Sequence, residues 1–186
     1  MKKNYRCVLL IARNHGLETL RFLLELKKFQ VLIVFTHRCN PKSYDPEQKQ
    51  RSDYEYFVKL TKSKNIPLIT IDKKYELSKL ENYCNSIEYD FLISISWRYL
   101  ISPTVFMKAN IGSLNLHRGD LPKYAGIEPI RRSLENNESE IAICSHIISK
   151  NYDEGEILCR VKHPVNYDAK KTLNQNVNRL KEEITP

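Results

Sequence analysis

The sequence of 186 residues has no apolar run near the about 20 residues that a membrane-spanning helix needs. Its longest apolar run near the N-terminus, from Val8 to Ala12, is too short for the core of a signal peptide. We therefore expect a cytoplasmic protein that has no membrane partner. Glycine is also scarce, at five residues, and the chain has neither Gly-x-Gly-x-x-Gly nor Gly-x-x-x-x-Gly-Lys-Ser/Thr. This disfavours a Rossmann cofactor site and a P-loop.

The cysteines do not form a recognisable disulfide or metal pattern. There are five, an odd number, and no two stand in a Cys-x-x-Cys pair. Cys7, Cys144 and Cys159 lie in apolar, strand-like segments, which favours free buried thiols in a reducing compartment. His37 and Cys39 could both ligate a metal, but two candidate ligands do not make a zinc site. We therefore predict no metal.

Positive charge is present in excess, and it is unevenly distributed. The formal net charge is +8. Residues 1–64 hold 14 lysines and arginines against 6 acidic residues, whereas residues 65–186 hold 16 of each. The excess favours an anionic partner, and its scatter among acidic residues, without a nucleic-acid motif, disfavours a nucleic-acid-binding module. We expect an anionic small molecule instead.

Short apolar runs alternate with amphipathic stretches along the first half of the chain. This alternation predicts an α/β fold, with a mostly parallel sheet flanked by helices and an antiparallel strand pair near the C-terminal end. The length suits one domain over 1–186, with a C-terminal helix within 169–186. We predict strands over 5–12, 31–36, 67–71, 91–96, 111–116, 141–148 and 155–165, a loop over 38–51, and helices over 17–28, 53–63, 76–86, 128–137 and 169–183, with another starting at 102–103.

The densest group of unusual residues follows the predicted strand over 111–116. Asn115 and His117 are two positions apart, so their side chains share a face at the carboxyl end, where ligands of parallel sheets bind. Asp153 lies in the connector of the last two strands. An amide that donates to a developing oxyanion, an imidazole that moves a proton and a carboxylate that orients the imidazole make an acyl-transfer set. The residue types also fit a satisfied polar turn followed by a hairpin turn.

Three motifs in this order resemble the signature of the folate-dependent formyltransferases: Asn115-x-His117, Leu121-Pro122-x-Tyr124-x-Gly126 and Asp153-x-Gly155-x-Ile157. The resemblance implies a Rossmann-like formyltransferase fold and one catalytic domain over 1–186. It implies 10-formyltetrahydrofolate as the formyl donor and a primary amine as the acceptor. It also implies that Asn115 and protonated His117 stabilise the oxyanion, while Asp153 pairs with His117 and helps to move the amine proton.

A second matching segment implies the folate site. In the family, the strand-to-helix loop that corresponds to residues 96–103 holds the pterin through backbone groups. The resemblance assigns this role to Trp97, Arg98 and Leu100, and it places the backbone near Tyr152 on the other side of the pterin. Trp97 also fits plain packing, because aromatic side chains dominate protein cores.

The acceptor is less well specified than the donor. Gly119 and Ala125 stand where many members carry serine and arginine. The loop after the first strand lacks the glycines of the purine enzyme, and the chain ends soon after its last strand, without the β-barrel of the methionyl-tRNA enzyme. Thr36-His37 and the charged loop resemble the nucleotide-sugar N-formyltransferases. We therefore expect an amino sugar linked to a nucleotide, with Arg13 and His15 against its phosphates.

Other readings stay open. Glycinamide ribonucleotide or methionyl-tRNA could be the acceptor, and a formyltetrahydrofolate hydrolase would use water with the same three residues. Arg13 and His15 could equally be solvated loop residues. A homodimer is a further expectation. Many nucleotide-sugar enzymes of the family dimerise through an additional C-terminal segment, which this chain lacks or has only as the expected helix over 169–183.

Overall fold

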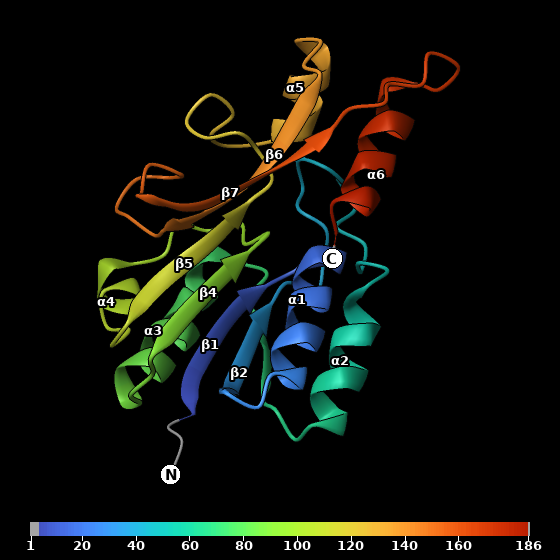
Figure 1. Cartoon of the computed structure of the whole chain (residues 1–186). Coiled ribbons are helices and arrows are strands. Elements are labelled where there is room, and N and C mark those ends of the chain that lie inside the picture. The colour runs from blue at the N-terminus through green and yellow to red at the C-terminus, as the bar shows by residue number, and fades with distance from the viewer. Residues whose placement is uncertain (1–3, 186) are drawn as a thin grey trace. The chain divides into compact units, whose positions relative to one another are not determined.

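The computed structural model describes residues 4–185, which form two compact units that divide after Ser113. Among these residues no helix is both long and apolar enough to cross a membrane. Each unit has its own strands and its own core, and both units appear in Figure 1.

The first unit is a parallel sheet in the order β3-β2-β1-β4. In Figure 1, α1 and α2 lie on one side of these strands and α3 on the other. Both faces of the inner strands are therefore covered, which explains their continuous apolar sequences. The elements are β1 (Tyr5–Ile11), α1 (Arg13–Glu25), β2 (Phe29–Thr36), α2 (Tyr54–Ser63), β3 (Leu68–Thr70), a 3-10 helix (Lys74–Glu76), α3 (Leu77–Ser86), β4 (Phe91–Ile95) and α4 (Pro103–Phe106).

The second unit is built around antiparallel pairing. Strand β5 (Gly112–His117) begins at the division, and its residues from Leu114 pair antiparallel with β6 (Glu140–Ile147). Strand β6 pairs in turn with β7 (Ile157–Pro164). Helices α5 (Pro129–Glu135) and α6 (Leu173–Glu183) bury an apolar cluster against this sheet. The cluster consists of Ile130, Leu134, Ile141, Val177, Leu180 and Ile184.

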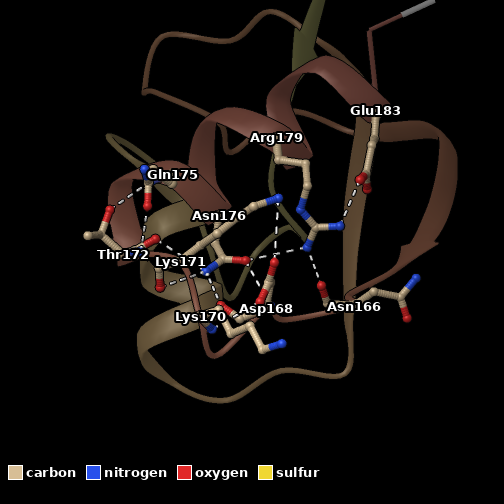
Figure 2. Close-up of polar contacts among 9 residues, drawn as sticks. All are labelled: Asn166, Asp168, Lys170, Lys171, Thr172, Gln175, Asn176, Arg179 and Glu183. Carbon is tan, nitrogen blue, oxygen red and sulfur yellow. Dashed lines mark hydrogen bonds and ion pairs between the residues drawn. The ribbon is translucent and has the colours of Figure 1, made fainter.

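The segment before α6 is held to the helix by one buried amide (Figure 2). Asn176 is fully buried, and its Oδ1 accepts from the backbone N–H of Asp168 at 2.9 Å. Its Nδ2 lies within hydrogen-bond distance of the carbonyls of Asp168, Lys171 and Thr172, at 3.0, 3.4 and 3.2 Å. All the polar atoms of this side chain are therefore satisfied, as burial requires.

Two of the expected helix starts differ from those in the structure. The first helix begins at Arg13 rather than residue 17, because Gly16 brings its first turn against Ile11, where a Cβ would lie 2.9 Å from the Ile11 Cβ. The last helix begins at Leu173 rather than Ala169, because Thr172 and Gln175 form a capping box (Figure 2). Helices start where the first backbone N–H groups find partners, and apolar periodicity does not report this.

Two burial expectations are also corrected. Cys159 is exposed because β7 is the last strand of its sheet, whereas Cys7 and Cys144 are buried as predicted. The expected surface loop over 38–51 ends in a buried side chain. Arg51 is buried because it makes a two-point ion pair with Asp53, with Nε to Oδ1 at 3.0 Å and Nη2 to Oδ2 at 2.7 Å.

Candidate active site

Strand pairing in the second unit brings three polar side chains to one place. Asn115 and His117 are two residues apart on β5, so their side chains share a face of the strand, as predicted. The antiparallel register sets Asn115 opposite His146 and His117 opposite Cys144. Asn115 Nδ2 lies 3.0 Å from His146 Nε2. The pairing of β5 with β6 therefore adds a second histidine to the candidate site.

Asp153 joins this group from the connector between β6 and β7. It adopts a left-handed backbone conformation, with φ of 55°, which aspartate tolerates better than most residues. Its Oδ1 accepts from Asn115 Nδ2 at 3.3 Å and also lies 3.3 Å from His146 Nε2. Its Oδ2 lies 3.3 Å from His117 Nδ1 and accepts from the Gly126 N–H at 2.8 Å. One carboxylate thus contacts both imidazoles and the amide.

The backbone fixes the tautomer of His117. Its Nε2 lies 2.7 Å from the carbonyl oxygen of Tyr124, which can only accept, so Nε2 carries a proton. The nitrogen that titrates is then Nδ1, which faces Asp153. Burial lowers the pKa of His117; the Asp153 charge and the Tyr124 carbonyl oppose this shift, while His146 and Arg132 add to it. The net direction is downward, so the imidazole is neutral near pH 7 and Nδ1 can accept a proton.

The neighbours of Asp153 stabilise the ionised form of its carboxyl group. Burial raises the pKa of this carboxyl, but His146, His117 and the Gly126 N–H outweigh burial and hold the pKa below its ordinary value. The carboxylate is therefore ionised beside a neutral His117 near pH 7. An imidazole that takes a proton in this position gains a charged partner at once.

Two glycines allow the surrounding backbone to come this close. A Cβ on Gly119 would lie 2.7 Å from His117 Nε2 and 2.8 Å from the Tyr124 carbonyl oxygen. A Cβ on Gly155 would lie 1.7 Å from the Ile147 carbonyl oxygen. The glycine at position 119, where the family often has serine, therefore has a local reason: the loop packs directly on the imidazole.

The predicted folate residues Trp97, Arg98 and Leu100 lie in the first unit, in the loop after β4. The Trp97 ring stacks on His37 at 4.3 Å, and its buried Nε1 has no hydrogen-bond partner among the described residues. Arg98 donates from Nη2 to the Cys39 carbonyl at 2.6 Å. Leu100 is 49% exposed. Tyr152, the fourth predicted folate residue, belongs to the second unit and is exposed. All four roles stay predictions.

His37 fixes the loop that follows β4. Its Nδ1 lies 2.5 Å from the Ile71 carbonyl oxygen, so Nδ1 carries the proton, and its Nε2 accepts from the Arg98 backbone N–H at 3.3 Å. Burial, followed by the charge of Arg98, lowers the pKa of His37 to about 3. The neutral ring therefore holds the backbone of the loop. Residues 4–185 contain no cluster of three or more histidine, cysteine, aspartate or glutamate side chains that could hold a metal ion.

The two predicted acceptor residues differ in their surroundings. Arg13 is half-buried at the start of α1, with φ of 66°, and its Nη1 donates to Asn40 Oδ1 at 3.2 Å. His15 is only 1% exposed. The expected loop over 13–16 is the first turn of α1, and this turn directs His15 inward. Arg13 is thus the more accessible of the pair.

The sequence is similar to known proteins of one kind. It matches the family described as "Formyl transferase" over residues 6–186. Methionyl-tRNA formyltransferase of Orientia tsutsugamushi (strain Boryong) is 31% identical over 142 residues, which are 75% of this chain but only 44% of that protein. This chain therefore spans less than half of that relative.

Solved structures share the fold. Glycinamide ribonucleotide transformylase 1 from Symbiobacterium toebii superposes with a TM-score of 0.73 at 17% identity, over 97% of this chain and 82% of that one. A formyltetrahydrofolate deformylase from Pseudomonas syringae pv. tomato str. DC3000 superposes with a TM-score of 0.75 at 14% identity, over 98% of this chain and 58% of that one. At these identities the likeness concerns the fold alone, and it confirms the predicted α/β class with its antiparallel end.

Proposed function

Because this chain belongs to the formyltransferase family, we propose that it transfers a formyl group from 10-formyltetrahydrofolate to a primary amine. The observation that carries this proposal is the position of Asp153, whose carboxylate contacts His117 on one side and Asn115 on the other. That arrangement supplies a proton acceptor, a hydrogen-bond donor and a fixed negative charge within one small volume.

The proposed chemistry divides among three side chains. The co-substrate supplies the formyl carbon that the acceptor amine attacks. Asn115 donates a hydrogen bond to the charge that develops on the formyl oxygen, and such donors stabilise a transition state strongly in a buried site. Neutral His117 accepts the amine proton at Nδ1, and Asp153 stabilises the imidazolium that results. When the tetrahedral intermediate collapses, the bond between the formyl carbon and N10 of the folate breaks, the imidazolium returns its proton to N10, and tetrahydrofolate leaves. This order differs from the one that the resemblance implies, since here the resting imidazole is neutral and becomes charged during the reaction.

The loop after β4 has features that fit a folate. Trp97 brings a buried indole N–H without a partner among the described residues, and Leu100 offers an exposed apolar surface. A pterin has ring edges that hydrogen-bond and flat faces that pack on apolar groups. We propose that Trp97, Arg98, Leu100 and Tyr152 contact the donor, with His37 keeping the loop in place.

We propose that the acceptor amine carries phosphate. The excess positive charge of residues 1–64 and the half-buried Arg13 support this class of acceptor. The names of the relatives point to methionyl-tRNA or glycinamide ribonucleotide, and they support these acceptors better than the nucleotide-linked amino sugar expected from the sequence. All three acceptors are anionic, and a tRNA acceptor would reverse the expectation that nucleic acid is not a partner. The homodimer and the cytoplasmic location remain predictions.

A panel of acceptors tests this proposal. The protein is incubated with 10-formyltetrahydrofolate and, in turn, methionyl-tRNA, glycinamide ribonucleotide, an aminosugar nucleotide or no acceptor, and the formylated amine is measured by mass spectrometry. We expect one anionic acceptor to be formylated, and Arg13→Gln to raise its KM with little change in kcat. Formate release at the same rate without any acceptor would show a hydrolase instead.

A further inference from the structure

We propose that the buried Arg51 is the inner group of an anion site in the first unit, where it acts behind Arg13 on the phosphomonoester or diphosphate group of a small molecule. The sequence motifs and the expected acceptor residues did not include Arg51. This inference deepens the proposed function, on which it rests for the role of the ligand as acceptor. Its main readout is the binding of an inorganic anion, which needs no formyl transfer.

The side chain of Arg51 is buried and still has an unused donor. It is 1% exposed, and its Nε and Nη2 donate to the two carboxylate oxygens of Asp53. The Phe57 ring lies 5.5 Å from Cζ, which favours the charge but gives no oxygen acceptor. The buried Nη1 has no hydrogen-bond partner among residues 4–185. Because an unpaired buried donor costs free energy, a ligand that accepts from Nη1 is stabilised there.

Two more guanidinium groups are fastened beside Arg51 by residues 38–40 of the loop after β2. The carbonyl of residue 38 accepts from the Arg51 backbone N–H at 2.9 Å, and that of residue 39 accepts from Arg98 Nη2 at 2.6 Å. The side chain of residue 40, an asparagine, accepts from Arg13 Nη1 at 3.2 Å. Arginines that are far apart in the sequence are therefore anchored to three consecutive residues.

The positive charges of this group are only partly neutralised. Of the three arginines, only Arg51 has a carboxylate within ion-pair distance among residues 4–185, that of Asp53. Burial lowers the pKa of Arg13, and the charge of Arg51 lowers it further, against the opposing effects of Asp53 and Tyr44. Burial lowers the pKa of Arg98 as well, and Arg13 and Arg51 add to this effect. Like charges that disfavour one another in this way are stabilised by a bound anion.

The different exposure of the arginines indicates the kind of anion. Arg13 is half-buried and Arg51 is fully buried, so an anion contacts Arg13 first. A bridging water, or a small shift of the covering side chains, brings Nη1 of Arg51 to it. A phosphomonoester or a diphosphate carries about two negative charges in a compact group, and guanidinium forks match its oxygens. An internal RNA phosphodiester carries one charge between two sugars, so a small phosphorylated amine fits this site better than a tRNA.

Isothermal titration of the full chain with inorganic pyrophosphate tests the site. We expect the unsubstituted chain to bind it and Arg13→Gln to bind about 10-fold more weakly. Asp53→Asn removes the neutralising charge but keeps an oxygen acceptor for Arg51, so we expect it to bind about 3-fold more tightly. A purely structural pair of Arg51 and Asp53 predicts no such gain. Arg21→Gln is the matched control and should bind as before, because this arginine of α1 pairs with Glu18 at the surface.

A further variant and a second ligand complete the design. Arg51→Gln should abolish pyrophosphate binding; it leaves Asp53 unpaired, so its fold is checked by circular dichroism, and Asp53→Asn decides if it does not fold. A single-stranded RNA oligonucleotide is titrated in the same way.

Three results would overturn the inference: no pyrophosphate binding by the unsubstituted chain, equal affinities in Asp53→Asn and Arg13→Gln, or tighter binding of the RNA that Arg13→Gln abolishes. Pyrophosphate binding with the expected pattern but no formyl transfer to any amine would instead overturn the proposed function and leave the anion site in place.

Discussion

Oδ2 of Asp153 lies 3.3 Å from Nδ1 of His117, while the Tyr124 carbonyl accepts from the opposite nitrogen of the same ring. This relationship determines which nitrogen can accept a proton and which charge receives the imidazolium. It also predicts how the activity depends on pH.

Formyl transfer should require the neutral form of His117. Burial lowers the pKa of His117 below the ordinary 6.5. As the pH rises, the ring therefore releases its extra proton with a midpoint below pH 6.5, and it is neutral above that midpoint. We expect kcat/KM to be constant above about pH 6.5 and to decrease as the pH falls through a midpoint below this value. Steady-state rates between about pH 5 and pH 8 measure this. A rate that increases on acidification would contradict the assignment of His117 as the proton acceptor.

His37 should make the first unit less stable in acid. Its pKa is about 3 in the folded chain and about 6.5 when unfolded, so between these values the unfolded chain binds a proton that the folded chain does not. The contribution of His37 is therefore fully present above pH 6.5 and decreases as the pH falls toward 3. We expect His37→Asn, which cannot take up this proton, to show a smaller decrease in Tm between about pH 7 and 4.5. An equally steep dependence in His37→Asn would refute this role.

Gly155 should tolerate no side chain. The Cβ of an alanine would overlap the Ile147 carbonyl oxygen at 1.7 Å, so the connector that carries Asp153 must move. We expect Gly155→Ala to lose about 1–3 kcal/mol of unfolding free energy and most of its formyl transfer. Gly112→Ala is the matched control, since no atom lies within 4 Å of its Cβ. The two variants are compared by urea denaturation and by initial rates, and equal behaviour would contradict the described geometry.

Asn176 should stabilise the second unit through the segment before α6 (Figure 2). Removing its amide leaves the Asp168 N–H and neighbouring carbonyls without this partner in a buried place. We expect Asn176→Ala to lose about 2–3 kcal/mol of unfolding free energy. Asn178→Ala, on the exposed side of the same helix, should lose far less. Denaturant midpoints measure the loss of stability in each variant. The same midpoint for both variants would show that Asn176 does not stabilise the segment before α6.

Local spacing was enough to predict part of the candidate site. Asn115 and His117 are two residues apart on one strand, so their common face follows from strand geometry alone. His146 could not be found in this way, because its contact with Asn115 depends on the register between β5 and β6, whose paired residues are about thirty positions apart. The only signal in the sequence was a histidine inside an otherwise apolar strand, which fits a satisfied core residue equally well.

Helix ends and burial were also beyond the reach of periodicity. The inward direction of His15 follows from the start of α1 at Arg13, and this start depends on the close approach of Gly16 to Ile11. The exposure of Cys159 follows from its place on the last strand of the sheet. Both facts belong to tertiary packing, which a run of apolar residues does not encode.

The most direct measurement is tetrahydrofolate release from 10-formyltetrahydrofolate, followed spectroscopically in the presence of the acceptor panel. The unsubstituted chain is compared with His117→Ala, and with His163→Ala as the control. We expect release that depends on an amine acceptor, a loss on the order of 100-fold or more in His117→Ala without unfolding, and no loss in His163→Ala. A folded His117→Ala variant that releases tetrahydrofolate as fast as the unsubstituted chain would contradict the account.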